Sequence, residues 1–473
     1  MFRTLPAYAA TRPDEFWAAR VPEHWQVLPG MAVVSENKCK NDGLIESQVL
    51  SLSFGQVIVK PVEKQRGLVP ESYEGYQVLD PGDIVIRPTD LQNDQRSIRV
   101  GMVRDRGIIT SAYIGLRARQ PWSTDYAHAY LVAVDSTKRI YGMGSGLRQQ
   151  LGWVDLKRMP CLVPPKDEQA AIVKYLAHAN SRIDKAIAAK RRLIALLGQS
   201  RTAVVDSLVL GRDVQNRRPS PAPWLESVPS GWEWRRCRTL TSFITSGSRG
   251  WAEYYADAGP MFLQSGNLGR KLDLKLAQVQ RLALPASATE GVRTRVQPRD
   301  VLVCITGALT GNVAVIPDDW RDEAYVNQHV SLVRPRHVEV DSQFLGHAMK
   351  SQPCQFQFKG SEYGGTKQGL GLDEVKNLEV LLPPLAEQRA IVTAIKVETE
   401  AIDSAIRRAE QEVAVLGEFR TRLVADVVTG QVDVRGIADN LPGIDLDAAS
   451  GVSGLADASH LADLDDALTG SET

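Results

Sequence analysis

The segment LLPPLAEQRAIVTAI, residues 381–395, determines the predicted fold, because a close copy, LVPPKDEQAAIVKYL, occupies residues 162–176. The similarity extends well beyond these two segments: residues 146–211 align with residues 365–430 without a gap. An internal repeat of this length defines the architecture of a chain. The alignment predicts that one structural unit occurs twice.

Weaker similarity lies upstream of each copy. VPEHW at 21–25 corresponds to VPSGW at 228–232, and LDPGDIVIRP at 79–88 corresponds to VQPRDVLVCI at 296–305. The upstream parts have diverged more than the downstream parts. The repeat therefore predicts two similar long segments attached to two dissimilar globular parts.

Each downstream copy predicts one long helix. Pro-Pro pairs at 164–165 and 383–384 suit helix starts, and Gly211 and Gly430 suit helix ends. Apolar residues recur at spacings of three, four and seven, which makes a narrow stripe along each helix. The stripe comprises Ile172, Leu176, Ala179, Ile183, Ile187, Ile194, Leu197 and Val204 in the first copy, and Ile391, Ile395, Ile402, Ile406, Val413, Leu416 and Leu423 in the second.

Such a stripe would be exposed on a single helix. We therefore expect the helices at about 166–211 and 385–430 to bury their stripes against each other in an antiparallel pair. The alternative is that each helix packs only on its own domain. Length argues against this alternative, because roughly 45 residues at about 1.5 Å each reach roughly 70 Å, which exceeds the width of a small domain.

The predicted organisation is α+β, with mixed, mainly β domains at 1–160 and 216–380. They stand at opposite ends of an antiparallel two-helix coiled-coil spacer formed by 161–215 and 381–436, with a pseudo-two-fold internal repeat. Residues 437–473 form a tail with eight acidic residues and no Lys or Arg. Its composition favours disorder, with a short partner-binding segment as the alternative.

The whole chain has 56 basic and 56 acidic residues. Because eight of the acidic residues lie in the tail, the rest of the chain is mildly basic. No apolar run approaches the roughly 20 residues of a membrane helix, and the N-terminus lacks the apolar stretch of a signal peptide. The five cysteines are scattered without a CxxC pair, as expected of reduced, ordinary residues. We expect a cytoplasmic protein.

No motif for catalysis is found. GxxxxGK[ST], HExxH, GxSxG and GxGxxG opening a helix are all missing from the sequence. ITGALTG at 305–311 has no lysine and is expected to be a β-turn, and His128 and His329 are expected to be loop or core residues. Glu168-Gln169 and Glu387-Gln388 fall in the first turn of each predicted helix, where cap and dipole chemistry is favoured over catalysis. We expect no cofactor, no metal and no catalytic residue.

Basic residues interleaved with Gly, Ser, Asn and Gln suggest contact with DNA, because Lys and Arg reach phosphates while Arg, Asn and Gln pair with base edges. The alternative is that these residues form turns or a solvated surface. The candidates in the second domain lie in polar or Gly-rich loops at the ends of β-like runs, and those in the first domain lie in the counterpart basic segments. They are Arg249, Asn267, Thr306, Gln328 and Lys367 in the second domain, and Lys38, Arg87 and Arg148 in the first.

Taken in order, GDIV at 82–85 and RDVL at 299–302, AYVNQHVSLVRP at 324–335, GGTKQGL at 364–370 and LPPLAEQRAIV at 382–392 resemble the specificity subunits of type I restriction-modification systems. This resemblance covers about residues 20–435. The first copy departs from it, with VPPKDEQ in place of PPLxEQ and GLRQQLG in place of GTKQGLG.

The resemblance implies a non-catalytic DNA-recognition subunit. Each globular domain would be a target recognition domain that reads one half of a split, double-stranded site. The helices would set the spacing and dock methyltransferase (M) subunits, expected to be two, with restriction/motor (R) subunits as further partners. The alternative is a coiled-coil interaction scaffold that does not bind DNA.

Overall fold

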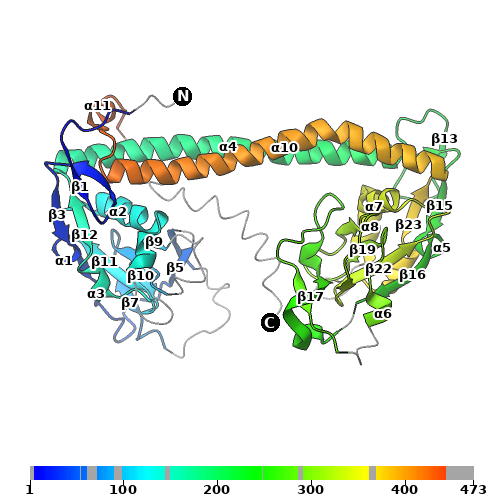
Figure 1. Ribbon diagram of the computed structural model, residues 1–473, viewed down its shortest axis with the longest axis horizontal. Coiled ribbons are helices and arrows are strands. Elements are labelled where there is room, and N and C mark those ends of the chain that lie inside the picture. The colour runs from blue at the N-terminus through cyan, green and yellow to red at the C-terminus, as the bar shows by residue number, and fades with distance from the viewer. Residues whose placement is uncertain are drawn as a thin grey trace. The chain divides into compact units, whose positions relative to one another are not determined.

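The chain divides into two compact units, which are described separately. Unit 1 consists of Met1–Arg192 and Ala409–Asp463, and unit 2 consists of Leu193–Arg408 and Leu464–Thr473. The division falls within two long helices, α4 (Lys166–Val209) and α10 (Leu385–Val428) (Figure 1). The computed structural model describes residues 5–53, 55–60, 72–89, 99–143, 150–247, 249–285, 291–361 and 369–443. The expected mixture of helix and sheet with a long helix in each repeat is confirmed.

In the described part of unit 1, the largest sheet has the strand order β4-β11-β8-β9-β6-β5, with separate pairs β1-β2, β10-β7 and β12-β3. Helix α2 packs on β9 and β11, and Tyr126 of this helix forms a buried aromatic cluster with Trp122. The elements are β1 (Thr11–Asp14), β2 (Ala19–Pro22), β3 (Gln26–Pro29), α1 (Gly30–Val33), β4 (Val34–Glu36), β5 (Leu50–Ser53), β6 (Gln56–Val59), β7 (Gln77–Leu79), β8 (Ile84–Ile86), β9 (Val100–Met102), β10 (Gly107–Ile109), β11 (Ile114–Ala118), α2 (Thr124–Ser136), η2 (Arg139–Gly142), α3 (Trp153–Leu156), β12 (Pro160–Val163) and α11 (Arg435–Ala438).

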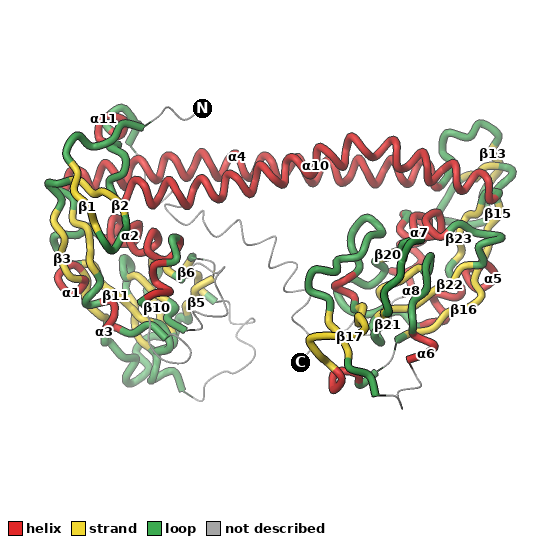
Figure 2. The backbone as a smooth tube through the Cα atoms, in the orientation of Figure 1, coloured by secondary structure: helices red, strands yellow, loops and turns green. Residues whose placement is uncertain are grey.

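In the described part of unit 2, the sheet β16-β22-β19-β20 faces a second sheet, β18-β17-β21, with separate pairs β13-β14 and β15-β23. Figure 2 shows its strands gathered in the globular part. The elements are β13 (Arg217–Pro219), β14 (Ser227–Pro229), β15 (Glu233–Arg236), α5 (Cys237–Leu240), β16 (Thr241–Ser246), η3 (Trp251–Tyr254), β17 (Tyr255–Leu263), η4 (Ser265–Asn267), β18 (Gln280–Leu282), α6 (Gly291–Thr294), β19 (Val301–Cys304), β20 (Val313–Val315), β21 (Ala324–Val326), β22 (Val330–Pro335), α7 (Ser342–Lys350), α8 (Gln352–Ser361), α9 (Leu372–Asn377) and β23 (Glu379–Leu382).

Strand β19 explains why the sequence VLVC is apolar at every position. Successive side chains of a strand point to opposite faces of the sheet. Val301 and Val303 belong to the core shared with Phe344 of α7, whereas Leu302 and Cys304 belong to the core shared with the second sheet. The strand is buried on both faces and has no polar side.

The two units share an order of elements that the sequence showed only faintly. β1-β2 and β13-β14 are hairpins before the first core strand, and β3-β12 matches β15-β23. The central order β4-β11-β8-β9 matches β16-β22-β19-β20, and a helix, α2 or α7, follows β11 or β22. The repeat thus includes the diverged globular parts.

The aspartate of the GDIV and RDVL segments has the same role in each unit. Asp83 and Asp300 are each 1% exposed and stand directly before β8 and β19. Arg117 Nε and Nη2 donate to Asp83 at 2.7 and 2.8 Å, and Arg334 Nε and Nη2 donate to Asp300 at 2.9 and 2.8 Å. These bidentate pairs satisfy a buried carboxylate and join the start of one strand to its neighbour.

The helix ends follow the predicted signals. Gly211 and Gly430 have φ of 55° and 68°, in the left-handed region that favours glycine after a helix. A Cβ at Gly211 would lie 2.9 Å from Trp232, and one at Gly430 would lie 3.0 Å from Trp25. The tryptophan of each VPxxW segment therefore packs against the end of a long helix, α10 in unit 1 and α4 in unit 2.

Within unit 1, the start of α4 and the end of α10 pack antiparallel, because Asp184 pairs with Arg420 while Lys190 Nζ lies 2.6 Å from Glu412. Within unit 2, Arg201 of α4 pairs with Asp403 of α10 at 2.9 Å. The stripe of α4 is buried from Ile172 to Ile187, but Ile194, Leu197 and Val204 are only half-buried. None of the helices within the described ranges is long and apolar enough to cross a membrane.

The repeated glutamine joins each long helix to the loop before α2 or α7. Gln169 Oε1 accepts from the Ser123 amide at 2.8 Å, and its Nε2 donates to the carbonyls of Pro121 and Pro164. Gln388 Oε1 accepts from the Asp341 amide at 2.8 Å, and its Nε2 donates to the carbonyls of Glu339 and Pro383. Ser123 and Asp341 are the N-caps of α2 and α7. The glutamine therefore has a structural role. It acts through tertiary hydrogen bonds between the long helix and the globular part, and not only through capping of its own helix.

Glu168 differs from its repeat partner Glu387. It is 3% exposed and accepts hydrogen bonds from Tyr8, Trp25 and Arg435 at 3.0, 2.8 and 3.2 Å, with His24 Nε2 at 2.6 Å. Glu387 is half-buried. Glu168 thus ties segments from both ends of the chain to the start of α4.

Candidate nucleic-acid interface

The ends of β16, β17, β19 and β21 lie together in unit 2. β17 and β21 are parallel with Leu263 opposite Val326, so the loops that follow them leave from the same edge. The Asn327 amide donates to Leu263 O at 3.1 Å, and the Gly247 amide donates to Asn327 O at 3.1 Å. The Ile305 amide donates to His329 O at 2.9 Å. Loops distant in sequence therefore form one surface, which we call the strand-end face. It consists of residues 247, 249–250, 264–267, 305–311 and 327–329.

Glycine is required at 247 for this contact. A Cβ at Gly247 would lie 1.9 Å from Val326 O and 2.2 Å from Asn327 O, so any side chain would push the two loops apart. Arg249 follows in the same loop and is exposed. A guanidinium on a fixed loop can reach a phosphate or pair bidentately with guanine.

Thr306 and Gln328 meet at His329. Thr306 Oγ1 contacts His329 Nδ1, and Gln328 Nε2 lies 3.0 Å from His329 Nε2. The His329 amide donates to Asn327 Oδ1 at 3.1 Å, which shapes the turn between β21 and β22. The structure therefore brings together two of the predicted residues through a histidine that sequence reasoning assigned to a loop or core. Its position between two short β-like runs in AYVNQHVSLV was the available signal.

Asn267 lies at the same face, but its amide is used within its own loop. Asn267 Oδ1 accepts from the Gln264 amide at 2.9 Å, and Nδ2 donates to Lys275 O at 3.0 Å. Asparagine commonly stabilises turns in this way. Lys367, the fifth candidate of this domain, lies outside the described residues.

Lys38 and Arg87 follow β4 and β8 of unit 1. Both strands are antiparallel to β11, so their ends lie at one edge of the sheet, as those of β16 and β19 do in unit 2. Lys38 is 79% exposed with Nζ 3.6 Å from Glu36, and the Arg87 amide donates to Arg99 O at 2.8 Å. Arg148 lies outside the described residues. The two predicted residues that are described thus share an edge.

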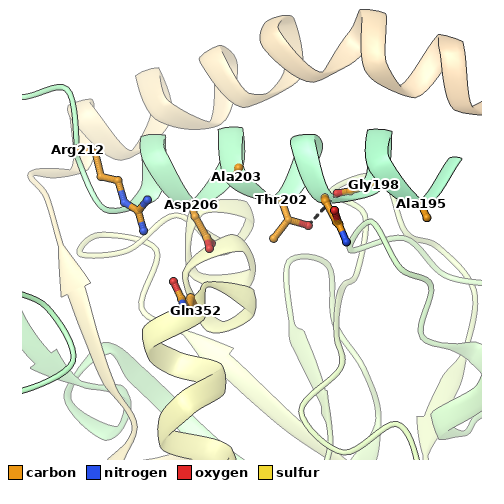
Figure 3. A pocket seen from close by; sticks show the side chains of 8 residues that line it. Ala195, Gly198, Thr202, Ala203, Asp206, Arg212 and Gln352 are labelled. Carbon is orange, nitrogen blue, oxygen red and sulfur yellow. Dashed lines mark hydrogen bonds between the residues drawn. The ribbon is translucent and has the colours of Figure 1, made fainter. Parts of the chain in front are cut away.

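A shallow hollow of about 510 Å³ lies on α4 in unit 2. Figure 3 shows Ala195, Gly198, Thr202 and Ala203 along the helix, while Asp206 points towards Gln352 of α8. Burial raises the pKa of Asp206, with opposing contributions from the Gln352 amide and Arg212. Asp206 and Arg212 are the charged residues that line the hollow, and the remaining lining residues are small or carry neutral polar side chains. Among the described residues, no group of three or more His, Cys, Asp or Glu could hold a metal ion.

Comparison with known proteins identifies part of unit 2. Residues 287–411 match the family model described as the type I restriction modification DNA specificity domain. The type I restriction enzyme EcoBI specificity subunit of Escherichia coli is 22% identical over 288 residues, covering 59% of this chain and 59% of that protein. The match thus spans less than two thirds of this relative's length.

One chain of a solved structure is similar at the level of fold. A chain from the structure on complex assembly and conformational transition of the type I R-M system has a TM-score of 0.53 and 15% identity, and the alignment covers 88% of this chain and 100% of that chain. The HsdS subunit from Thermoanaerobacter tengcongensis has a TM-score of 0.37 and 16% identity, covering 88% of this chain and 99% of that chain.

The family match includes β19, β21 and β22, and with them the turns that carry Thr306, Gln328 and His329. The similar E. coli protein is a specificity subunit, and the fold matches a chain of a type I system. The predicted resemblance is thereby confirmed: residues 287–411 match a type I DNA specificity domain, and the chain is similar to a specificity subunit of a type I restriction-modification system.

Proposed function

We propose that this protein is the DNA sequence-recognition subunit of a type I restriction-modification complex. The observation that carries this function is the match of residues 287–411 to a DNA specificity domain, because that segment contains two of the four loop segments of the strand-end face, 305–311 and 327–329. The coiled-coil scaffold without DNA binding is not favoured, since it gives no reason for this match.

Recognition domain 1 (residues 1–160) and recognition domain 2 (residues 216–380) each read one half of a split double-stranded site. Arg249, Gln328 and Lys367 suit base-edge or phosphate contacts in domain 2, as Lys38, Arg87 and Arg148 do in domain 1. Thr306 orients His329, and Asn267 contributes by holding its loop. The polar residues on fixed strand ends support this assignment, because loops on a rigid sheet hold side chains in a defined geometry.

The spacer consists of residues 161–215 and 381–436, paired antiparallel over their whole length. Each helix has 44 residues and therefore reaches about 66 Å. At about 3.4 Å per base pair, such a spacer places the half-sites no more than about 20 base pairs apart. We infer a bipartite site with a short unspecific gap.

The helices also dock methyltransferase subunits, two for the two halves, and restriction subunits complete the complex. This chain supplies recognition and no catalysis. The repeated sequence supports the arrangement, because two similar helices can present similar surfaces to two copies of one partner. The acidic residues 437–473 have no role in this proposal.

The test is to express the chain with the methyltransferase subunit of its own system and to map methylated positions on unmethylated genomic DNA. We expect one bipartite motif with a fixed gap. Exchange of residues 216–380 for those of a relative should change one half of the motif only. A continuous motif, a change in both halves, or an absence of any DNA preference would refute the proposal. The purified chain alone should neither methylate nor cleave DNA with S-adenosylmethionine, ATP and magnesium.

A further inference from the structure

A loop of unit 2 connects the strand-end face with the long helices. This reading loop, residues 264–275, begins where β17 ends. Asn267 closes its base, since its Nδ2 donates to Lys275 O and its carbonyl accepts from the Lys275 amide at 2.8 Å. Towards the tip, the Gly269 amide donates to Asp273 O at 2.8 Å, and Leu272 is 4% exposed within the core. The loop is therefore a compact, internally bonded element.

The tip of the reading loop touches both long helices. Lys271 Nζ lies 2.7 Å from Asp403 Oδ1 of α10, and Arg201 Nε of α4 lies 2.9 Å from the same oxygen. The side chain of Asp403 is 14% exposed and that of Lys271 is 37% exposed. Burial acts to raise the pKa of Asp403, but the hydrogen bond from Lys271 and the charge of Arg201 outweigh it and lower the pKa. Asp403 is thus a charged, largely buried anchor.

A second contact holds the backbone of the tip. Lys350 Nζ of α7 donates to Arg270 O at 2.6 Å and to Asn312 Oδ1 at 3.0 Å. Asn312 Nδ2 in turn donates to Leu268 O at 2.9 Å. The tip therefore moves with α7 and the central sheet, and Lys271 links that body to α10.

Comparison of the two units separates the roles of Arg201 and Lys271. The repeat aligns Arg201 with Arg420 and Asp403 with Asp184, and Arg420 pairs with Asp184 in unit 1. The Arg201–Asp403 pair therefore belongs to the repeated pairing of the helices. Lys271 comes from the globular part and joins this pair from outside.

Lys271 also makes a second attachment along the helix. The core of the domain reaches α10 at Ile391 and Ile395, and Asp403 lies eight residues further along, which is about 12 Å in a helix. A body attached at one place can rock about it. Two attachments separated along the helix axis resist that motion.

We propose that Lys271 is a positioning residue that, through Asp403, holds recognition domain 2 at one angle on the long helices and so makes DNA binding sensitive to the length of the gap. The inference rests on the proposed function. One additional base pair moves a half-site by about 3.4 Å and rotates it by about 34°. A domain held at two points cannot follow that rotation, whereas a domain held at one point can.

The test uses the full chain in complex with its methyltransferase subunits and duplexes that carry the native gap or one more base pair. The gap ratio is the dissociation constant for the longer gap divided by that for the native gap. Lys271→Met should lower this ratio about tenfold, with affinity for the native gap changed less than about threefold. Lys271→Arg should retain the ratio of the unmodified protein. Lys376→Met is the matched control, because Lys376 pairs only at the surface of α9 with Asp373 at 3.0 Å.

A Lys271→Met complex with an unchanged gap ratio overturns the inference and leaves the proposed function intact. An unmodified complex without sequence-dependent binding overturns the proposed function itself. Lys271→Gln is a second neutral variant, with thermal unfolding measured for each. A structural role alone would lower the unfolding temperature and the affinity for both duplexes equally, and that result also refutes the inference.

Discussion

Replacing Gln388 by Leu should destabilise unit 2 without touching the strand-end face. Gln388 is 0% exposed and makes hydrogen bonds to Asp341 N, Glu339 O and Pro383 O. Leucine preserves much of the volume but removes all of these bonds. At about 1 kcal/mol net for each bond, the loss is about 3 kcal/mol, and backbone groups left unpaired would increase it. For a unit of this size, that loss lowers the midpoint of thermal unfolding by about 6–12 °C.

The measurement is thermal unfolding followed by circular dichroism and by calorimetry, which separates transitions of the two units. Gln169→Leu should lower the transition of unit 1 instead, because Gln169 makes the equivalent bonds there. Glu387→Ala is the matched control, since Glu387 is only half-buried and surface substitutions change stability by about 0.5 kcal/mol or less. A Gln388→Leu protein that unfolds at the temperature of the unmodified chain would refute the assigned role of the repeated glutamine.

Three further outcomes are expected. Ile183→Asp combined with Ile402→Asp should lower the unfolding temperature and weaken DNA binding, because an unpaired charge between the helices is costly; unchanged values in both assays would contradict the spacer. Burial lowers the pKa of His347 to about 4 in the folded protein, so on acidification the unfolded chain takes up a proton at this histidine at a higher pH than the folded protein does. The free energy of unfolding should therefore fall as the pH drops from about 6.5 towards 4. His347→Gln should reduce this pH dependence in unfolding scans at several pH values. Gln328→Ala should relax specificity at one position of the site at a cost of about 1–3 kcal/mol of binding free energy, measured by selection from random DNA. Arg249→Ala, as the loss of a phosphate contact, should weaken binding to all sequences and reduce the slope of log affinity against log salt concentration by about one, measured by salt titration.

The long helices could be predicted from local signals. The Pro-Pro pairs and the positive-φ glycines stand at the ends of α4 and α10, where proline and glycine have strong backbone preferences. The apolar stripe was also readable, although Ile194, Leu197 and Val204 are less buried than the stripe alone suggests. Helical periodicity indicates which face is apolar, but not how much partner surface covers it.

The strand-end face could be predicted only in part, because it depends on pairing between distant segments. The polar turns around Thr306 and Gln328 are visible in the sequence, but their common contact, His329, depends on the hydrogen bond from the Ile305 amide to His329 O across the sheet. Asn267 shows the converse: the residue type suits base reading, but its amide bonds to its own loop. Local sequence gives the residue types, while the register of the strands decides which side chains meet.

The contacts between the two ends of the chain in unit 1 have a consequence for synthesis on the ribosome. Gln431 bonds to Arg20 O, the Asp433 amide to Pro6 O, and Arg435 to Glu168, so unit 1 needs residues that are made after the segment Leu193–Arg408. Between Arg192 and Ala409 the ribosome must make the segment Leu193–Arg408 of unit 2, which takes about 10–40 s at about 5–20 residues per second. During that interval the start of α4 lacks the face of α10 that covers it, whereas the described residues of unit 2 all come from the segment Leu193–Arg408, which can fold first. The nascent chain is therefore expected to expose an apolar helix face for tens of seconds, and to depend on chaperones in that period more than a chain whose domains fold in order.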